Sequence, residues 1–63
     1  MLIRWTKQND HTWTANLRGL PLTIVMMHCC YRLTINGQFS TLMTDTLAEC
    51  MTGASKAFAF MNQ

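Results

Sequence analysis

The chain has 63 residues, three of them cysteines, and its formal net charge at pH 7 is +2. So short a chain forms a single domain, residues 1–63, and buries only about 60% of the surface that its unfolded form exposes, so a partner subunit or another stabilising aid is expected. A net charge of this size is too small for a dedicated polyanion-binding protein, which is strongly basic. Because the number of cysteines is odd, they cannot all form disulfides within one chain.

The first predicted element is a strand over Leu2–Lys7, because apolar and polar residues alternate along it. Ile3 and Trp5 share its apolar face. A loop over Gln8–Thr12, rich in turn-forming residues, leads into the next strand and keeps the apolar faces together. The pairs expected across this loop are Ile3–Leu17 and Trp5–Ala15.

Residues 12–35 contain three consecutive strands by the same alternation. A two-residue turn at Arg18–Gly19, where glycine supplies a positive φ, joins the first two, and a four-residue connection over Met27–Cys30 joins the last two. Pro21 has no N–H to donate, so it is expected at the first residue of its strand or at a bulge. The register that keeps apolar residues on one side predicts the pairs Leu17–Leu20, Ala15–Leu22, Trp13–Ile24, Met26–Tyr31, Ile24–Leu33 and Leu22–Ile35.

An Asn-Gly dipeptide follows at 36–37, and this dipeptide is common in two-residue hairpin turns. Such a hairpin would place Gln38 on the apolar face and Phe39 on the polar face, which is the reverse of what burial favours. We therefore predict that the sheet ends here. The residues from 38 to 43 are then a linker, in which Phe39 and Leu42 cover one end of the core.

The C-terminal segment changes to the 3.6-residue period of an amphipathic helix. Thr46 and Glu49 have the spacing of a capping box, and Thr44 is an alternative cap. Gly53 costs about 1 kcal/mol relative to alanine inside a helix, so we expect it to allow a close approach to Trp5 or Trp13. The apolar stripe of this helix consists of Leu47, Met51, Ala54, Phe58 and Met61, flanked by Cys50 and Ala57.

Together these elements predict an α+β fold of two layers, because one apolar helix stripe and one apolar sheet face must cover each other. An antiparallel meander of three to four strands carries a single C-terminal helix on one face (β-β-β-β-α). The sheet edges are then Leu2–Lys7 and Tyr31–Ile35. The helix is expected to lie across Trp5, Trp13, Ile24, Tyr31 and Leu33.

The residues of metal-ligating type are His11, His28, Cys29, Cys30 and Cys50. Adjacent cysteines do not readily bind one ion with tetrahedral geometry, so we favour incidental thiols and expect neither a metal nor a cofactor. The role of His28, Cys29 and Cys30 stays open.

The acidic residues are Asp10, Asp45 and Glu49. They suit a turn and the N-terminus of a helix, and no acid–base or nucleophile constellation remains. The chain is therefore predicted not to be an enzyme. A secretory leader and an apolar run of about 18 residues are both missing from the sequence, so we expect a soluble cytoplasmic protein.

The polar face of the sheet raises nucleic-acid binding as an alternative function. It carries Arg4, Arg18 and Arg32 among threonines and no carboxylate, which suits contact with a phosphate backbone. Threonine is also a good strand former on a solvated face, and the tryptophans point inward, so no exposed aromatic platform is expected. A solvated face is the favoured interpretation.

The order of elements resembles that of the sheet-and-helix DNA-binding domains of integrases and of some plant transcription factors. The resemblance is carried by a tryptophan-x-alanine strand at 13–15 and a phenylalanine-x-threonine sequence at 39–41 before an alanine-bearing helix. It implies a DNA-binding sheet face, whereas the extra strand and the scarcity of arginine depart from that pattern.

Protein binding is the leading predicted function. Val25, Met27 and Phe60 fall on the polar sides of their elements, and a small domain with such residues and two free sheet edges is expected to bury surface against another chain. We predict a non-enzymatic interaction or regulatory module, of the size that phages and mobile elements often encode, that binds a host protein or self-associates. Neither a membrane nor a small-molecule substrate is expected as a partner.

Overall fold

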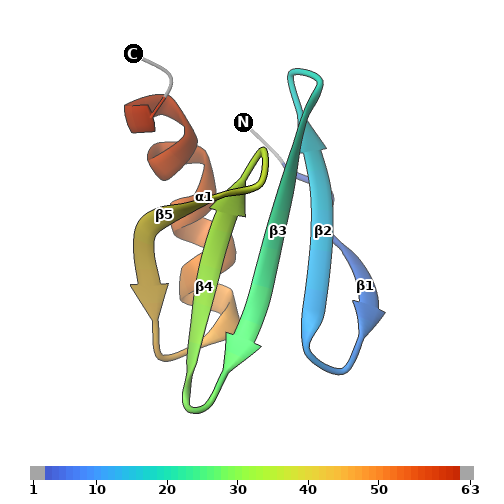
Figure 1. The fold of residues 1–63 in the computed structure, drawn as a ribbon, viewed down its shortest axis with the longest axis vertical. Helices are drawn as coiled ribbons and strands as arrows, with labels where there is room; N and C mark the ends of the chain where they lie inside the picture. The colour runs from blue at the N-terminus through green and yellow to red at the C-terminus, as the bar shows by residue number, and fades with distance from the viewer. Residues whose placement is uncertain (1–2, 62–63) are drawn as a thin grey trace.

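A computed structural model describes residues 3–61, which form a five-stranded antiparallel sheet with one helix packed on it (Figure 1). The sheet order is β1-β2-β3-β4-β5, a simple meander. The predicted two-layer α+β fold with a C-terminal helix is confirmed, with five strands instead of three to four. The elements are β1 (Thr6–Asn9), β2 (Thr12–Leu17), β3 (Leu20–Met27), β4 (Cys30–Ile35), β5 (Gln38–Thr44) and α1 (Leu47–Met61).

The three central strands have the register that the apolar alternation predicts. Every pair expected between β2, β3 and β4 is present, from Leu17–Leu20 to Leu22–Ile35. Arg18 and Gly19 form the first turn with φ of 52° and 81°. The second turn is shorter than predicted, because Met27 and Cys30 still pair with each other.

Pro21 lies within the regular part of β3, so its predicted position at a first residue or a bulge is wrong. It is the second residue of the strand and pairs with Asn16 without a shift of register. Its carbonyl accepts a hydrogen bond of 2.8 Å from the N–H of Asn36. Proline has no N–H, and its carbonyl is hydrogen bonded. The strand therefore continues past Pro21.

The first strand begins four residues later than predicted and ends two residues later. Its register is the expected one, with Thr6 opposite Thr14, but Ile3 and Trp5 precede the strand and pack against the core. The predicted pairs of these two residues and the five-residue loop are wrong. Leu2 lies outside the described residues.

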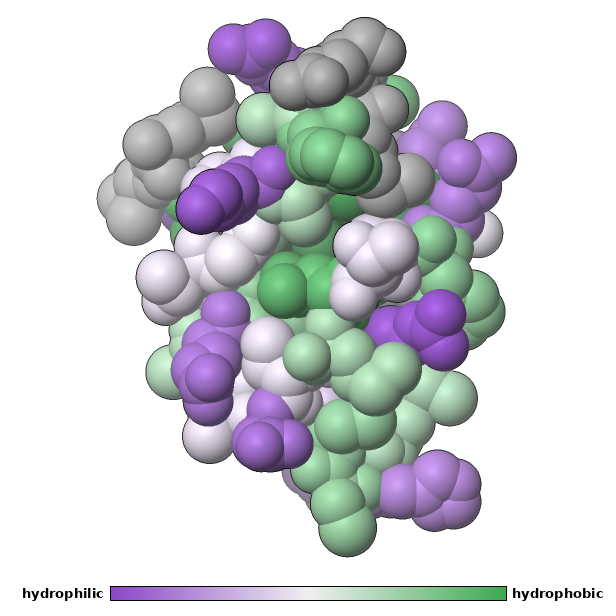
Figure 2. All heavy atoms as spheres, turned by 90° about the vertical axis from the view of Figure 1, so that its left-hand side faces the viewer, coloured by the Kyte–Doolittle hydropathy of each residue, from purple (hydrophilic) through white to green (hydrophobic). Residues whose placement is uncertain are grey.

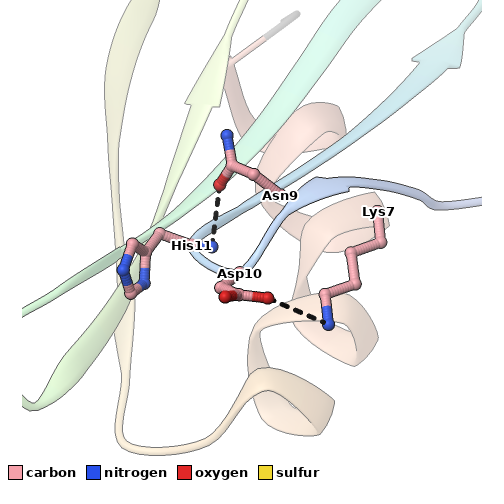
Figure 3. Close-up of polar contacts among 4 residues, drawn as sticks. All are labelled: Lys7, Asn9, Asp10 and His11. Atoms are coloured by element: carbon pink, nitrogen blue, oxygen red, sulfur yellow. Dashed lines mark hydrogen bonds and ion pairs between the residues drawn. The ribbon is translucent and has the colours of Figure 1, made fainter.

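An asparagine side chain explains why the turn after β1 is tight. Asn9 Oδ1 accepts a hydrogen bond of 2.8 Å from the N–H of His11, and Lys7 Nζ lies 3.8 Å from Asp10 Oδ1 (Figure 3). Such a local bond to the backbone closes a turn within two residues. β1 therefore extends to Asn9, where the register shifts.

β5 occupies the segment that the sequence predicts as a linker, and this prediction is wrong. Asn36 and Gly37 have φ of 51° and 83° and form a two-residue hairpin turn. The sequence prediction rejects this turn because it places Phe39 on the polar face of the sheet. Gln38 pairs with Ile35 at the end of the sheet and stays exposed. Phe39 lies on the sheet face that α1 does not cover and is 58% exposed.

The side chain of Ser40 stabilises an irregularity in β5. Residues 40–42 of β5 lie between Phe39 and Met43, where only residue 33 lies between their partners in β4, so β5 carries two extra residues. The Ser40 hydroxyl donates to the carbonyl of Leu33 (2.9 Å) and accepts from the N–H of Leu42 (3.1 Å). Because the insertion is even, residues on either side of it keep their faces.

The helix begins at the predicted capping box. The N–H of Glu49 donates to Thr46 Oγ1 (3.2 Å), and the Thr46 hydroxyl donates to Glu49 Oε1 (2.8 Å). Thr44 instead donates to the Thr46 carbonyl (2.7 Å), so Thr46 is the cap. Gly53 approaches Leu42 and not the tryptophans: a Cβ there would lie 3.2 Å from Leu42 Cδ1.

The core lies between α1 and the apolar face of the sheet, and its buried apolar strand residues come from β2, β3 and β4. The helix itself lies nearest to β5 and β4, and not over the centre of the strands as predicted (Figure 1). Trp5 and Trp13 are half-buried beside this core, and the rings of Trp13 and Tyr31 are 5.8 Å apart. The Met61 side chain lies outside what the structure describes. The buried apolar residues are Leu17, Leu22, Ile24, Leu33, Ile35, Cys50, Ala54 and Phe58.

Ser40→Ala is expected to lower the free energy of unfolding by about 1–3 kcal/mol, because it leaves a buried carbonyl and a backbone N–H without a partner. Ser40 is 4% exposed. Thr41→Ala, at the exposed neighbouring position, is the control and should change this free energy by less than about 0.5 kcal/mol. Urea denaturation measures both, and equal losses would contradict the assigned role of the serine hydroxyl.

Candidate interaction surfaces

The face of the sheet away from α1, here the open face, carries the first candidate surface. The strand pairings place Val25, Arg32 and Met43 side by side in one row across β3, β4 and β5. Phe39 lies in the next row, opposite Thr34. Figure 1 looks onto this face, with α1 behind β4 and β5.

The guanidinium of Arg32 lies over the Phe39 ring, with Cζ 4.4 Å from the ring centroid. A cation over an aromatic ring at an exposed site contributes about 0.5–1 kcal/mol. Met43 is 56% exposed and Met27 is 39% exposed, while Val25 is half-buried. We call this surface the Arg32 patch, and it consists of Val25, Met27, Arg32, Phe39 and Met43.

Within the described residues, Arg32 contacts the Phe39 ring and makes no ion pair with a carboxylate. Its Nε atom is buried and has no hydrogen-bond partner among the described residues. The ion pair found among residues 3–61 joins Lys7 and Asp10 at the β1–β2 turn, away from Arg32. The arginine therefore brings an unneutralised charge into a mostly apolar surface.

The structure brings together only part of the predicted protein-binding set. Val25 and Met27 are in the Arg32 patch, whereas Phe60 is on α1 and is 73% exposed. The sequence prediction does not include Phe39 and Met43, because it assigns their segment to a linker. The Asn-Gly dipeptide and the alternation of Phe39, Thr41 and Met43 were the signals for a fifth strand.

The three arginines proposed for nucleic-acid binding do not form one cluster. Arg4 precedes β1 and Arg18 occupies the β2–β3 turn. Five residues of β3, about 17 Å of strand, separate the row of Arg32 from that turn. The prediction that the polar face has no exposed aromatic side chain is wrong, because Phe39 is exposed there beside Arg32.

The sheet edges also differ from the prediction. β4 lies between β3 and β5, so Tyr31–Ile35 is not an edge, and the edge strands are β1 and β5. β1 has four residues, includes Lys7 and has an irregular register. β5 has seven residues, none of them charged or proline.

A second candidate surface is a groove between β5 and α1, here the edge groove. Its volume is about 340 Å³, and residues 40–42 of β5 form one wall. Figure 2 views the molecule from this side and shows strongly apolar atoms near the middle, bordered by residues of intermediate hydropathy, with hydrophilic residues farther out. The opposite wall consists of Gly53, Lys56, Ala57 and Phe60 of α1.

The three thiols lie in different environments and are all free. Cys29 is exposed in the β3–β4 turn, and the Cys30 thiol donates to the Met27 carbonyl over 3.3 Å. Cys50 is buried, which raises the pKa of its thiol, and a hydrogen bond with the Thr44 side chain partly opposes that rise. Residues 3–61 contain no group of three or more His, Cys, Asp or Glu side chains arranged to hold a metal ion.

Within the described part of the chain, no helix has the length and apolar character needed to cross a membrane. Comparison with family models, with curated proteins and with solved structures finds no match to this chain.

Cys50 is expected to react with Ellman's reagent only as fast as the protein opens, because its thiol is buried and its raised pKa disfavours the thiolate. Cys29 should react first, since it is exposed. Stopped-flow absorbance at pH 8 measures the phases, and Cys50→Ala should remove the slowest one while Cys29→Ser removes the fastest. If Cys50→Ala still shows a phase with the rate of the slowest phase of the unsubstituted protein, that phase does not belong to Cys50 and the burial of this thiol is contradicted.

Proposed function

We propose that this chain is a non-enzymatic protein-interaction module that binds another protein through the Arg32 patch. The observation that carries the proposal is the gathering of Phe39, Met27 and Met43 around Arg32 on the open face. Aromatic residues, methionine and arginine are the types enriched at the centres of protein interfaces. Exposed apolar clusters of this kind commonly mark binding sites on small proteins.

The position of the patch on paired strands favours tight binding. Side chains on a rigid sheet lose less conformational freedom on association than side chains on loops. The stack of Arg32 on Phe39 already restricts both side chains before a partner arrives. A partner that offers an apolar surface with a carboxylate near its centre matches this chemistry.

Two of the three acidic residues have local structural contacts. Asp10 faces Lys7 in the β1–β2 turn, and Glu49 belongs to the cap of α1. Neither carboxylate lines the edge groove or belongs to the Arg32 patch. Three free thiols suit a reducing compartment such as the cytoplasm, where we place the module and its protein partner.

Phe39→Ser is expected to weaken partner binding at least about tenfold, the loss typical of a central aromatic contact. Phe60→Ser is the matched control, because it removes an exposed phenylalanine from the other surface. Quantitative capture from cells that naturally contain the protein, with each variant immobilised at equal density, measures the loss. A partner retained equally by both variants would rule out the Arg32 patch as its site.

Single-stranded nucleic-acid binding is a second candidate, and the exposed pair of Phe39 and Arg32 favours it. An aromatic ring on an open sheet face can stack on a base, while arginine contacts the backbone or stacks as well. Arg4 and Arg18, both exposed, would contribute further phosphate contacts.

For this candidate we expect a labelled oligothymidine to bind at low salt and to dissociate steeply as salt increases, because counterions are released on binding. Phe39→Ala and Arg32→Ala should each weaken the complex, Phe39→Ala by about five- to a hundredfold for one stacked base. Fluorescence anisotropy measures this binding. Lack of binding at 20 mM salt would remove the nucleic-acid candidate and leave protein binding.

A further inference from the structure

The edge groove is a surface separate from the Arg32 patch and has its own chemistry. Leu42, Ala57 and Phe60 give it an apolar lining, and its volume of about 340 Å³ is enough for one large side chain of a partner. Lys56 is the charged residue among those that line it, and no described carboxylate lies within ion-pair distance of it. The groove therefore combines an apolar hollow with one available cation.

The strand that borders the groove has an unpaired edge. β5 pairs with β4 on one side and with no described strand on the other. Edge strands are usually protected from pairing with another chain by charge, by proline, by a bulge or by short length. β1 is short, contains Lys7 and has an irregular register. β5 has neither charge nor proline over seven residues, and its irregularity at Ser40 is closed by hydrogen bonds within the molecule.

We propose that the edge groove binds an extended peptide segment of a partner protein, which adds a strand to β5 and carries an apolar side chain and a carboxylate two residues apart. The backbone of the segment hydrogen bonds to the free edge of β5, as in other cases of strand addition. The apolar side chain enters the hollow between Leu42 and Phe60, and the carboxylate pairs with Lys56.

The spacing of the two peptide residues follows from the spacing along α1. Figure 1 shows α1 running alongside β5 in the opposite direction. Lys56 and Phe60 are four residues apart on the helix, which corresponds to a rise of about 6 Å. Alternate residues of an extended strand face the same side and are separated by about 6.8 Å, so the two repeats match.

The experiment uses fluorescence anisotropy with labelled nine-residue peptides of alternating threonine and valine that contain a leucine and a glutamate two residues apart, in both orders. Matched peptides carry lysine in place of glutamate. One order of the glutamate peptides should bind about fivefold more tightly than its lysine counterpart, the effect of one exposed ion pair. Lys56→Glu should reverse this preference, whereas Lys7→Glu on the opposite edge, with the same change of charge, should leave it unchanged.

The remaining outcomes are decisive as well. Equal effects of Lys56→Glu and Lys7→Glu, or no binding of any peptide at millimolar concentration, would overturn the proposal. A dimer of the protein alone in sedimentation, abolished by Thr41→Lys on the β5 edge, would also overturn it by assigning the edge to a second copy. Phe39→Ser should leave peptide binding intact, so failure of the Arg32 patch and failure of the edge groove are distinguishable.

Discussion

The structure depends on the burial of one face of a five-stranded sheet beneath a single helix of 15 residues. One helix is too narrow to cover five strands, which are about 4.8 Å apart, and α1 packs on β4 and β5. The far half of the apolar face is completed by Ile3 and Trp5, which precede β1, and by the half-buried Trp13. Burial on one side only also leaves the opposite face of the sheet open, where the Arg32 patch lies.

β5 positions both candidate surfaces. Its alternation directs Phe39 and Met43 to the open face and Leu42 to the edge groove. The two residues inserted at Ser40 preserve this alternation, and the Ser40 hydroxyl satisfies the backbone groups of Leu33 and Leu42 that the insertion disturbs. The hydrogen bonds of one buried serine therefore determine where the exposed apolar residues of this strand lie.

The two surfaces suit different kinds of contact. The Arg32 patch is made of side chains on three paired strands and presents a charge stacked on an aromatic ring, which suits a folded partner surface. The edge groove combines an unpaired strand with a hollow and a lysine, which suits an extended segment. Because they lie on different sides of β5, the two proposed partners would not compete for the same residues.

The features that could be predicted from the amino-acid sequence are those that depend on local chemistry and on the period of apolar residues. These are the register of β2, β3 and β4 and the two-layer α+β fold. The choice between Thr44 and Thr46 as the cap of α1 came from the hydrogen bonds of the folded chain. Only the folded chain settled β5: the sequence contains strand signals at 36–43, but an exposed Phe39 is unfavourable until the folded sheet brings Arg32 over its ring. Tertiary structure also decided where α1 lies, since the contact of Gly53 with Leu42 exists only once β5 is in place.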